Sequence, residues 1–219
     1  MNMLVISTHP DDETLGCGGA VLKYKSLKKK VAWLNLTDLK EEYGYSRDSV
    51  TARAREIERV KKAYKFDGFY NLRLRPAGLD RYPLNELVTL ISGVISRVRP
   101  ECIIIPFRND VHSDHRIACD AILSAIKTFR QPGIQKVLMM EVLSETNFSA
   151  GDVVFVPDYF IDIGAFIEKK IKIMKLYKNE LKPHPFPRSE KSLRALAVLR
   201  GSQAGCEYAE SFKLVKAIE

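Results

Sequence analysis

Residues 3–19, MLVISTHPDDETLGCGG, join a short apolar run to a histidine, three consecutive acids and a cluster of glycines. The run MLVIS (3–7) is continuous and apolar, which is typical of a strand buried on both faces of a parallel sheet. In such sheets ligands bind outside the carboxyl ends of the strands, and His9 and the acids at 11–13 follow this strand directly. Like charges this close oppose one another, so the stretch also predicts a positive partner among the acids.

Along the rest of the chain, segments with the apolar pattern of a strand alternate with segments that have the apolar pattern of a helix. The predicted strands are 3–7, 31–37, 102–107, 135–142, 152–156 and 211–218, and the predicted helices are 17–29, 48–65, 84–98, 114–129, 164–181 and 189–203. This alternation predicts an α/β fold with a mostly parallel sheet and helices on both faces. The length of 219 residues predicts one domain, or one domain with an elaborated end.

The composition narrows the class of protein. No run of about 18 apolar residues occurs, so we expect no membrane span, and MNMLVIST lacks the length and basic start of a signal peptide. Cys17, Cys102, Cys119 and Cys206 show no paired spacing, which favours reduced thiols in a cytoplasmic protein. The net charge of +8 weakly favours an anionic substrate, a membrane surface or nucleic acid.

A second polar cluster, RNDVHSDHR (108–116), follows the predicted strand at 102–107. Because both clusters follow strands of a parallel sheet, they are expected to meet in space. His9 and Asp12 from the first cluster and His115 from the second supply two imidazoles and one carboxylate, which suits a catalytic zinc ion that keeps a fourth position for water. Such a dication would offset the crowded carboxylates.

The neighbouring side chains provide candidates for proton transfer. Asp11 lies beside the ligand Asp12, so it is the candidate general base that takes a proton from the attacking water. His112 is a candidate to stabilise the oxyanion or to protonate the leaving nitrogen, and Asp114 is a candidate to orient His112. His115 is expected in the first turn of a helix, where the helix dipole favours the neutral imidazole that binds a metal.

Simpler explanations exist for each cluster alone. A lone Asp11 or Asp114 would be a helix N-cap, and a lone histidine would be a surface residue. The glycines at 16, 18 and 19 resemble a dinucleotide-binding turn, but the preceding acids have the wrong sign for a pyrophosphate and the spacing differs from G-x-G-x-x-G. We therefore expect these glycines to allow close packing of a helix on the sheet.

The two clusters resemble the signatures of the PIG-L/LmbE family of zinc-dependent N-deacetylases, H-P-D-D-E after a strand and H-x-D-H later. Here they stand at residues 9–13 and 112–115. Supporting stretches cover most of the chain and are TARAREIERV (51–60), YFIDIGAFIEKKIKIM (159–174) and RGSQAGCEYAESF (200–212). The resemblance implies a single domain over residues 1–219 with a Rossmann-like, three-layer fold.

The resemblance also implies removal of an N-acetyl group from an N-acetylglucosamine unit. It implies that His9, Asp12 and His115 are the metal ligands, that Asp11 is the general base and that His112 assists in the transition state. These assignments agree with those reached from the residues. Imidazole and carboxylate accept both Zn²⁺ and Fe²⁺, so the native metal stays open.

Substrate contacts are less strongly indicated. The family suggests such a role for Arg53, whose guanidinium would suit a phosphate or carboxylate on an anionic aglycone. The alternative for Arg53 is an ion pair with Glu56 on a solvated face. Asn109 and Asp110 are candidates for hydrogen bonds to sugar hydroxyls. Arg188 and Arg200 are also candidates for meeting an anionic group, although surface placement is expected for both.

Two other functions compete with deacetylation. A metal-dependent phosphoester hydrolase would need two metals about 3.5–4 Å apart. A non-catalytic nucleic-acid binder would explain the charge of +8, but we expect no nucleic-acid partner, because the basic residues are spread along the chain. The expected partner is a small N-acetylated amino sugar. A homo-oligomer is left open, and the apolar stripe at 84–98 is expected in the core.

Overall fold

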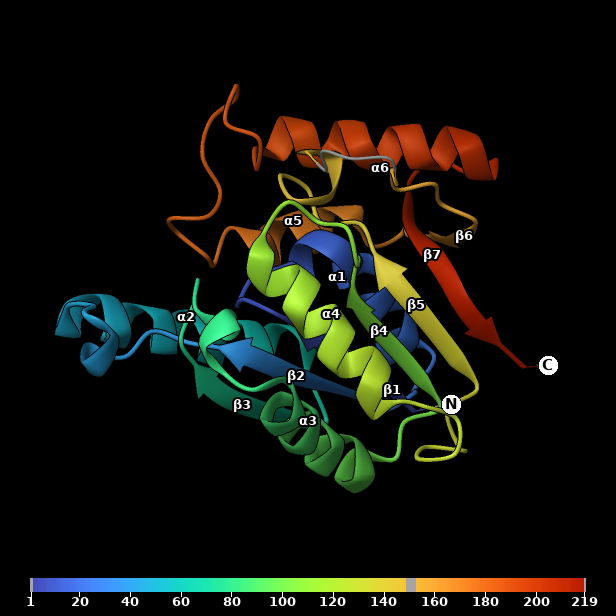
Figure 1. Cartoon of the computed structure of the whole chain (residues 1–219). Coiled ribbons are helices and arrows are strands. Elements are labelled where there is room, and N and C mark those ends of the chain that lie inside the picture. Colours follow the sequence, from blue (N-terminus) through green and yellow to red (C-terminus); the bar gives the residue numbers. More distant parts are fainter. Residues whose placement is uncertain (1, 149–152, 219) are drawn as a thin grey trace.

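One seven-stranded sheet forms the centre of the protein, with the strand order β3-β2-β1-β4-β5-β7-β6 (Figure 1). The computed structural model describes residues 2–148 and 153–218. The strands are β1 (Met3–Ser7), β2 (Val31–Thr37), β3 (Gly68–Leu74), β4 (Cys102–Pro106), β5 (Lys136–Met140), β6 (Tyr159–Asp162) and β7 (Ala209–Ala217). Neighbours among β1 to β5 are parallel, whereas β7 is antiparallel to β5 and β6. The predicted mostly parallel sheet is therefore confirmed.

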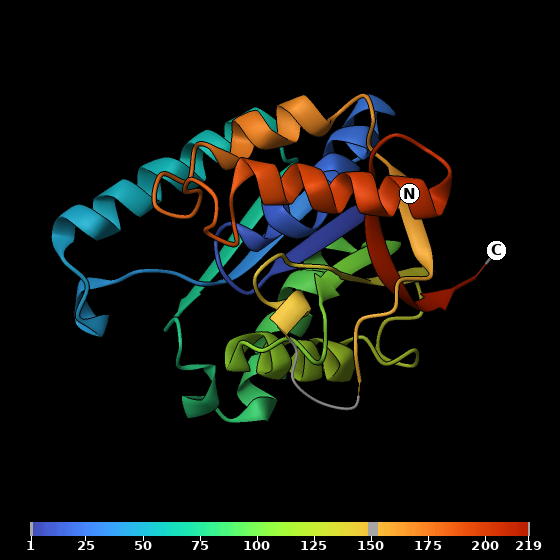
Figure 2. The same cartoon turned by 90° about the horizontal axis from the view of Figure 1, so that it is seen from above.

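Helices cover both faces of this sheet and complete a three-layer fold (Figures 1 and 2). They are α1 (Asp12–Ser26), α2 (Arg47–Tyr64), α3 (Leu84–Val98), α4 (Ser113–Ala125), α5 (Ile167–Met174) and α6 (Glu190–Ala204). One apolar core joins the sheet to α1, α2, α5 and α6, and a second joins its other face to α3 and α4. The chain thus buries both faces of the central strands, as their continuous apolar sequences require.

The order of the strands reverses at β1. From β1 the chain adds β2 and then β3 on one side, and it returns to place β4 on the other side of β1. β1 and β4 are paired in parallel, with Met3 beside Cys102, so their carboxyl ends lie at the same edge. Ligands of open α/β sheets bind in the crevice at such a reversal, which is where both polar clusters follow their strands.

Several predicted bounds were wrong. The strand β3 was missed, because its residues are half-exposed at the edge of the sheet rather than buried. Of the strand predicted at 152–156, Asp152 lies outside the described residues, residues 153–156 form no strand, and the strand follows at β6. The helix α1 begins at Asp12 rather than at residue 17, and α5 ends at Met174 rather than at 181.

Glycines in α1 allow the helix to lie close to its neighbours. A Cβ at Gly16 would overlap the side chain of Met140 in β5, and one at Gly19 would overlap Ile163. The structure therefore gives these glycines the packing role expected for them. The close approach fixes α1 against the sheet just beyond the loop that carries His9.

A buried ion pair holds a kink within α1, where Cys17 has non-helical dihedral angles. Glu210 of β7 accepts the backbone N–H groups of Gly19 and Ala20, each at 2.7 Å. Lys170 of α5 donates to Glu210 at 2.7 Å and to the carbonyl oxygen of Leu15 at 2.8 Å. The pair therefore satisfies backbone groups that the kink leaves without partners inside the helix.

The remaining predictions about core and surface can also be placed. Leu87, Ile91 and Ile95 of α3 are buried against the sheet, so the stripe at 84–98 belongs to the core. All four cysteines are free. Within the described ranges, no helix has both the length and the apolar character needed to cross a bilayer.

Candidate active site and metal centre

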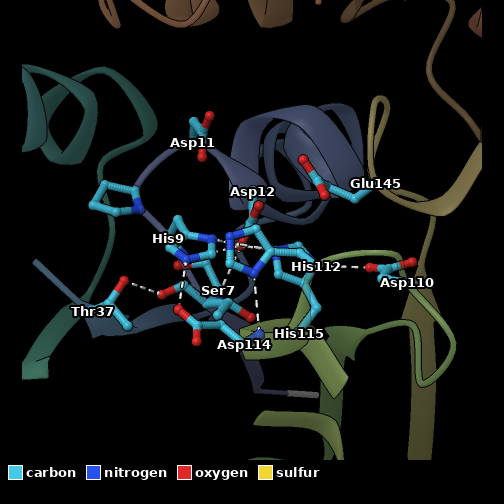
Figure 3. A network of polar contacts seen from close by, with 12 residues as sticks. Ser7, His9, Asp11, Asp12, Thr37, Asp110, His112, Asp114, His115 and Glu145 are labelled. Carbon is cyan, nitrogen blue, oxygen red and sulfur yellow. Dashed lines mark hydrogen bonds and ion pairs between the residues drawn. The ribbon is translucent and has the colours of Figure 1, made fainter. Parts of the chain in front are cut away.

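Three side chains from the ends of β1 and β4 converge on one point (Figure 3). Nε2 of His115 lies 3.3 Å from Nδ1 of His9 and 3.3 Å from Oδ2 of Asp12, and the last two atoms are 3.9 Å apart. Two ligand atoms that each lie about 2.0–2.1 Å from a tetrahedral zinc ion are about 3.3 Å from one another. Two of the three distances match this spacing and the third, 3.9 Å, is longer, so the three side chains can hold a single metal ion after a small adjustment.

The second nitrogen of each imidazole is held by a carboxylate. Nδ1 of His115 lies 2.7 Å from Oδ2 of Asp110, and Nε2 of His9 lies 3.2 Å from Oδ2 of Asp114. Such contacts fix the ring orientation and the tautomer, so that the other nitrogen presents its lone pair to a metal. Oδ2 of Asp12 also accepts the backbone N–H groups of Thr8 and His9, at 2.9 and 2.8 Å.

The pKa shifts of His115 and Asp12 indicate that this cluster attracts a positive charge. Burial lowers the pKa of His115, but the carboxylates of Asp12 and Asp110 outweigh burial and raise it well above its usual value. Burial raises the pKa of Asp12, and the two histidines outweigh it and lower the pKa. The helix dipole predicted a neutral ring for His115, whereas the two neighbouring carboxylates favour the protonated ring. A bound dication would take the place of the proton on Nε2.

Asp110 does not lie where the sequence placed it. Its carboxylate is fully buried and also accepts a hydrogen bond from Oγ1 of Thr146 at 2.7 Å, so the expected contact with a sugar hydroxyl is wrong. Its carboxylate instead contacts Nδ1 of His115 and so orients the ring, whose Nε2 faces His9 and Asp12.

We expect Asp110→Ala to weaken metal affinity or activity by about 10- to 100-fold, the usual cost of losing a carboxylate behind a ligating histidine. Titration with Zn²⁺ measures the affinity. Asp120→Ala is the matched control, because Asp120 lies on the same α4 and only pairs with Arg108 at the surface. An affinity equal to that of the unchanged protein would contradict this role for Asp110.

A second group, His9, His112 and Asp114, also has the ligand types for a metal. The carboxylate of Asp114 is already engaged, because it accepts the backbone N–H groups of Ala77 at 2.7 Å and Leu79 at 3.0 Å in addition to contacting His9. The two groups share His9, so the described residues offer one complete set at a time. The first set is favoured because the second nitrogen of each of its two imidazoles contacts a carboxylate that lies outside the set.

His112 is the N-cap of α4, and its Nδ1 accepts the backbone N–H of Asp114 at 3.1 Å. The sequence predicted that the carboxylate of Asp114 would orient His112, whereas the structure shows that its backbone N–H does so. In the neutral ring this bond leaves Nε2 protonated as a donor. Burial and the neighbouring His9 and His115 lower the pKa of His112 to about 4. The ring borders the cavity and can donate a hydrogen bond to a developing oxyanion.

The three consecutive acids have separate partners, which explains how the chain tolerates them. Asp12 faces the histidines, and Asp11 forms an ion pair with Arg188 at 3.1 Å. Glu13 is buried and accepts hydrogen bonds from the hydroxyl of Tyr177 and the backbone N–H of Asp11, at 2.9 and 3.0 Å. Burial is the main reason that the pKa of Glu13 rises to about 7.

Asp11 has the properties of a buried base beside the metal ligands. Burial and the charges of Asp12 and Glu180 raise its pKa well above the usual value, while Arg188 and Arg53 oppose the rise. Figure 3 shows its side chain on the opposite side of Asp12 from Glu145. The carboxylate borders the same cavity as the histidines, so it can accept a proton there.

A cavity of about 250 Å³ opens above the converging side chains. Its lining includes all the predicted ligands, the predicted base and His112, together with Arg53. It also includes Glu145 and Glu180, which the sequence did not identify, and Arg188, which the sequence offered only as a candidate for an anionic group. Asn109 is half-buried and does not line the cavity, so it makes no part of the site in this structure.

Both arginines of the cavity are paired with acids. Arg53 donates to the carbonyl oxygen of Pro10 at 3.0 Å and forms ion pairs with Glu180 and Glu56. Its side chain is 13% exposed, so the predicted pair with Glu56 is present but does not lie on a solvated face. Arg188 was expected at the surface and is instead part of the cavity wall.

Arg200 was also expected at the surface. It is half-buried and forms a two-pronged ion pair with Glu141. Neither it nor Arg188 lies in a sequence pattern that distinguishes a buried ion pair from a solvated charge. Their places follow from contacts between segments that are far apart in the chain.

Comparisons with known proteins agree with this geometry. The profile of the PIG-L family, described as GlcNAc-PI de-N-acetylase, matches residues 4–126, which include both motifs. The diacetylchitobiose deacetylase of Thermococcus kodakarensis is 25% identical over 225 residues, covering 99% of this chain and 84% of that protein.

Solved structures share the fold over almost the whole chain. N,N'-diacetylchitobiose deacetylase from Pyrococcus horikoshii has a TM-score of 0.78 at 20% identity and covers 98% of this chain and 84% of its own. GalB, the 4-carboxy-2-hydroxymuconate hydratase of Pseudomonas putida KT2440, has a TM-score of 0.74 at 17% identity. The match covers 100% of this chain and 97% of GalB. One fold thus carries different reactions, and the site must distinguish them. Because the profile spans more than half of the 219 residues and both motifs stand in the site, the chain belongs to the PIG-L family of GlcNAc-PI de-N-acetylases.

Proposed function

We propose that this protein is a metal-dependent hydrolase that removes the N-acetyl group of an amino sugar, releasing acetate and a free amine. The observation that carries the proposal is the convergence of His9, Asp12 and His115, whose ligand atoms lie 3.3 to 3.9 Å apart, beside the buried carboxylate of Asp11. The family and the deacetylase relative support the same reaction.

The residues of the site divide the chemistry between them. A bound Zn²⁺ or Fe²⁺ ion would polarise the acetamide carbonyl and lower the pKa of a water molecule. Asp11 takes a proton from the attacking water, whose oxygen forms the new bond to the carbonyl carbon. Nε2–H of His112 donates to the oxyanion. The proton held by Asp11 is passed to the leaving nitrogen as the C–N bond breaks, so acetate and amine are released.

An acetamido sugar is the proposed substrate, without a preference for an anionic aglycone. The guanidinium of Arg53 contacts the carbonyl oxygen of Pro10 and the carboxylates of Glu56 and Glu180, so its charge is already balanced by two acids. The cavity also contains Asp38 and Glu145, which disfavour an anion. The net charge of +8 is therefore not concentrated where the sugar would bind.

Phosphoester hydrolysis fits the site less well. Two-metal phosphoesterases hold their ions about 3.5–4 Å apart, and a carboxylate is needed to bridge them. Among the residues that the structure describes, the two candidate metal groups share His9, so both sets cannot be complete together. A single metal beside a carboxylate base is the arrangement expected for amide hydrolysis.

The test is an assay of both products. We expect the zinc-loaded protein to release acetate and primary amine in equal amounts from N-acetylglucosamine or its disaccharide. Chelation is expected to abolish the release and added Zn²⁺ to restore it, because the metal supplies the activated water. An aryl phosphate serves as the control substrate. Amine release that survives complete metal removal, or phosphate release without amine release, would contradict the proposal.

We also propose a cytoplasmic location for the protein. Its four cysteines are free, and three of them are buried, which suits a reducing compartment. Assembly into a homo-oligomer stays a prediction from the sequence.

A further inference from the structure

Arg188 reaches the active site from the segment between α5 and α6, immediately before Ser189, the N-cap of α6. Its Nη1 lies 3.1 Å from Oδ2 of Asp11 and 3.3 Å from Oε2 of Glu180. The side chain is 24% exposed and lines the cavity. An arginine 177 residues along the chain thus contacts the base of the proposed reaction directly.

Arg188 is itself held by a chain of charged contacts. Glu180 joins it to Arg53 of α2, and Arg53 donates to the carbonyl oxygen of Pro10. One network of Arg53, Glu180 and Arg188 therefore contacts both the backbone of Pro10 and the side chain of Asp11. Because that network draws on α2 and on the segment after α5, it fixes the loop from outside both sequence motifs.

Asp11 has an unusual backbone that needs such support. Its φ is 147°, in a region that L residues rarely adopt. A strained residue of this kind persists where the surrounding structure holds it, and it is often found at functional sites. Oδ2 of Asp11 is occupied by Arg188, whereas Oδ1 has no hydrogen-bond partner within the described ranges, and the residue lines the cavity.

We propose that Arg188 is a positioning residue for Asp11. By holding Oδ2, it fixes the carboxylate so that Oδ1 faces the substrate and takes the proton. The inference rests on the proposed function, because the role of Asp11 as base belongs to that reaction. It adds a residue that neither motif contains and that acts through Asp11 rather than on the substrate.

The test is a double-mutant cycle between Arg188→Ala and Asp11→Asn, with kcat, KM and metal content measured for each protein. We expect Arg188→Ala to lower kcat by about 10²-fold, because misplacing a catalytic group by about 1 Å can cost that much. KM and the metal content are expected to stay close to those of the unchanged protein. Arg188→Lys is expected to retain an intermediate kcat, since it keeps a cation but loses the planar fork.

The cycle separates positioning from a merely structural effect. Adding Arg188→Ala to Asp11→Asn is expected to change kcat by less than about 2-fold, because the two residues act as a unit. Arg194→Ala is the matched control. Arg194 of α6 pairs with Glu168 and Glu190 and does not line the cavity. Losses that multiply in the double variant, or a raised KM with kcat unchanged, would overturn the proposal.

A crystal structure of Arg188→Ala provides a readout that does not depend on activity. We expect φ of Asp11 or its side-chain rotamer to change when the guanidinium is removed. If the unchanged protein deacetylates no amino sugar, the proposed function fails, and this structure still decides whether Arg188 holds Asp11. An Asp11 that keeps both its φ of 147° and its rotamer would refute the positioning role.

Discussion

Replacing Asp11 with asparagine is expected to lower kcat by about 10²- to 10⁴-fold, the usual contribution of a positioned general base. Asparagine keeps the shape of the side chain but cannot take a proton from water. The buried carboxylate lines the cavity next to Asp12, the proposed metal ligand. Steady-state kinetics with an N-acetylated amino sugar measure the effect.

Metal content must be measured on the same protein, because the base and the ligand Asp12 are adjacent in the chain. The Asp11→Asn variant is expected to retain one metal ion. In the unchanged protein the carboxylate of Asp11 contacts Arg188 rather than the histidines. Asp120→Asn, on the exposed side of α4, is the control. A metal-loaded Asp11→Asn protein that keeps more than about a tenth of the original kcat would refute the assignment of the base.

Removal of His115 is expected to have a comparably large effect. His115→Ala deletes a ligand that is fully buried and that contacts both other ligands. It also removes the imidazole that contacts Oδ2 of the buried Asp110 carboxylate. Activity should fall by more than about 10³-fold, since losing only a supporting contact of a ligand already costs about 10- to 100-fold.

The measurement for His115→Ala is metal content after dialysis, together with kcat. His184→Ala is the matched control, because His184 is exposed and lies outside the active-site cavity. A circular dichroism spectrum shows that each variant is folded. Full metal occupancy with normal kcat in His115→Ala would exclude this residue as a ligand.

Both motifs could be located from the sequence because each follows a buried strand directly. The strands β1 and β4 are continuous apolar runs, and a parallel sheet brings their carboxyl ends to the same edge. Within each motif the spacing is short, so local structure fixes which side chains face inward. This is why His9, Asp12 and His115 could be grouped before their distances were known.

The start of α1 shows where local patterns fail. The sequence places its start at residue 17, after the acids, because Asp12 and Glu13 look like loop residues and the glycines weaken the helical pattern. In the structure these acids form the first turn of the helix, where the positive end of its dipole favours them. Tertiary contacts of Gly16 and Gly19 then outweigh their poor helix propensity.

The cavity wall opposite the motifs could not be predicted. Glu180 falls at the end of the helix predicted at 164–181, and Arg188 follows prolines at 183, 185 and 187, in a stretch with no helical or strand period. Charged residues in such a segment are usually solvated, and only the fold reveals that these two meet Arg53 and Asp11. Ion pairs between distant segments leave no spacing in the sequence.

Asp110 and Asp114 illustrate the same limit within a motif. The sequence assigned the first to a sugar hydroxyl and the second to His112. In the structure their carboxylates contact His115 and His9 instead. Which atom a carboxylate contacts depends on the backbone of neighbouring loops, here the N–H groups of Ala77 and Leu79.

Anomalous diffraction from crystals of the zinc-loaded protein tests the central claim most directly. We predict one ion per chain, bound by Nδ1 of His9, Oδ2 of Asp12 and Nε2 of His115 at about 2.0–2.2 Å, with a fourth position open to solvent. An ion held by His9, His112 and Asp114, or two ions in the cavity, would contradict the single-metal site and the reaction proposed for it.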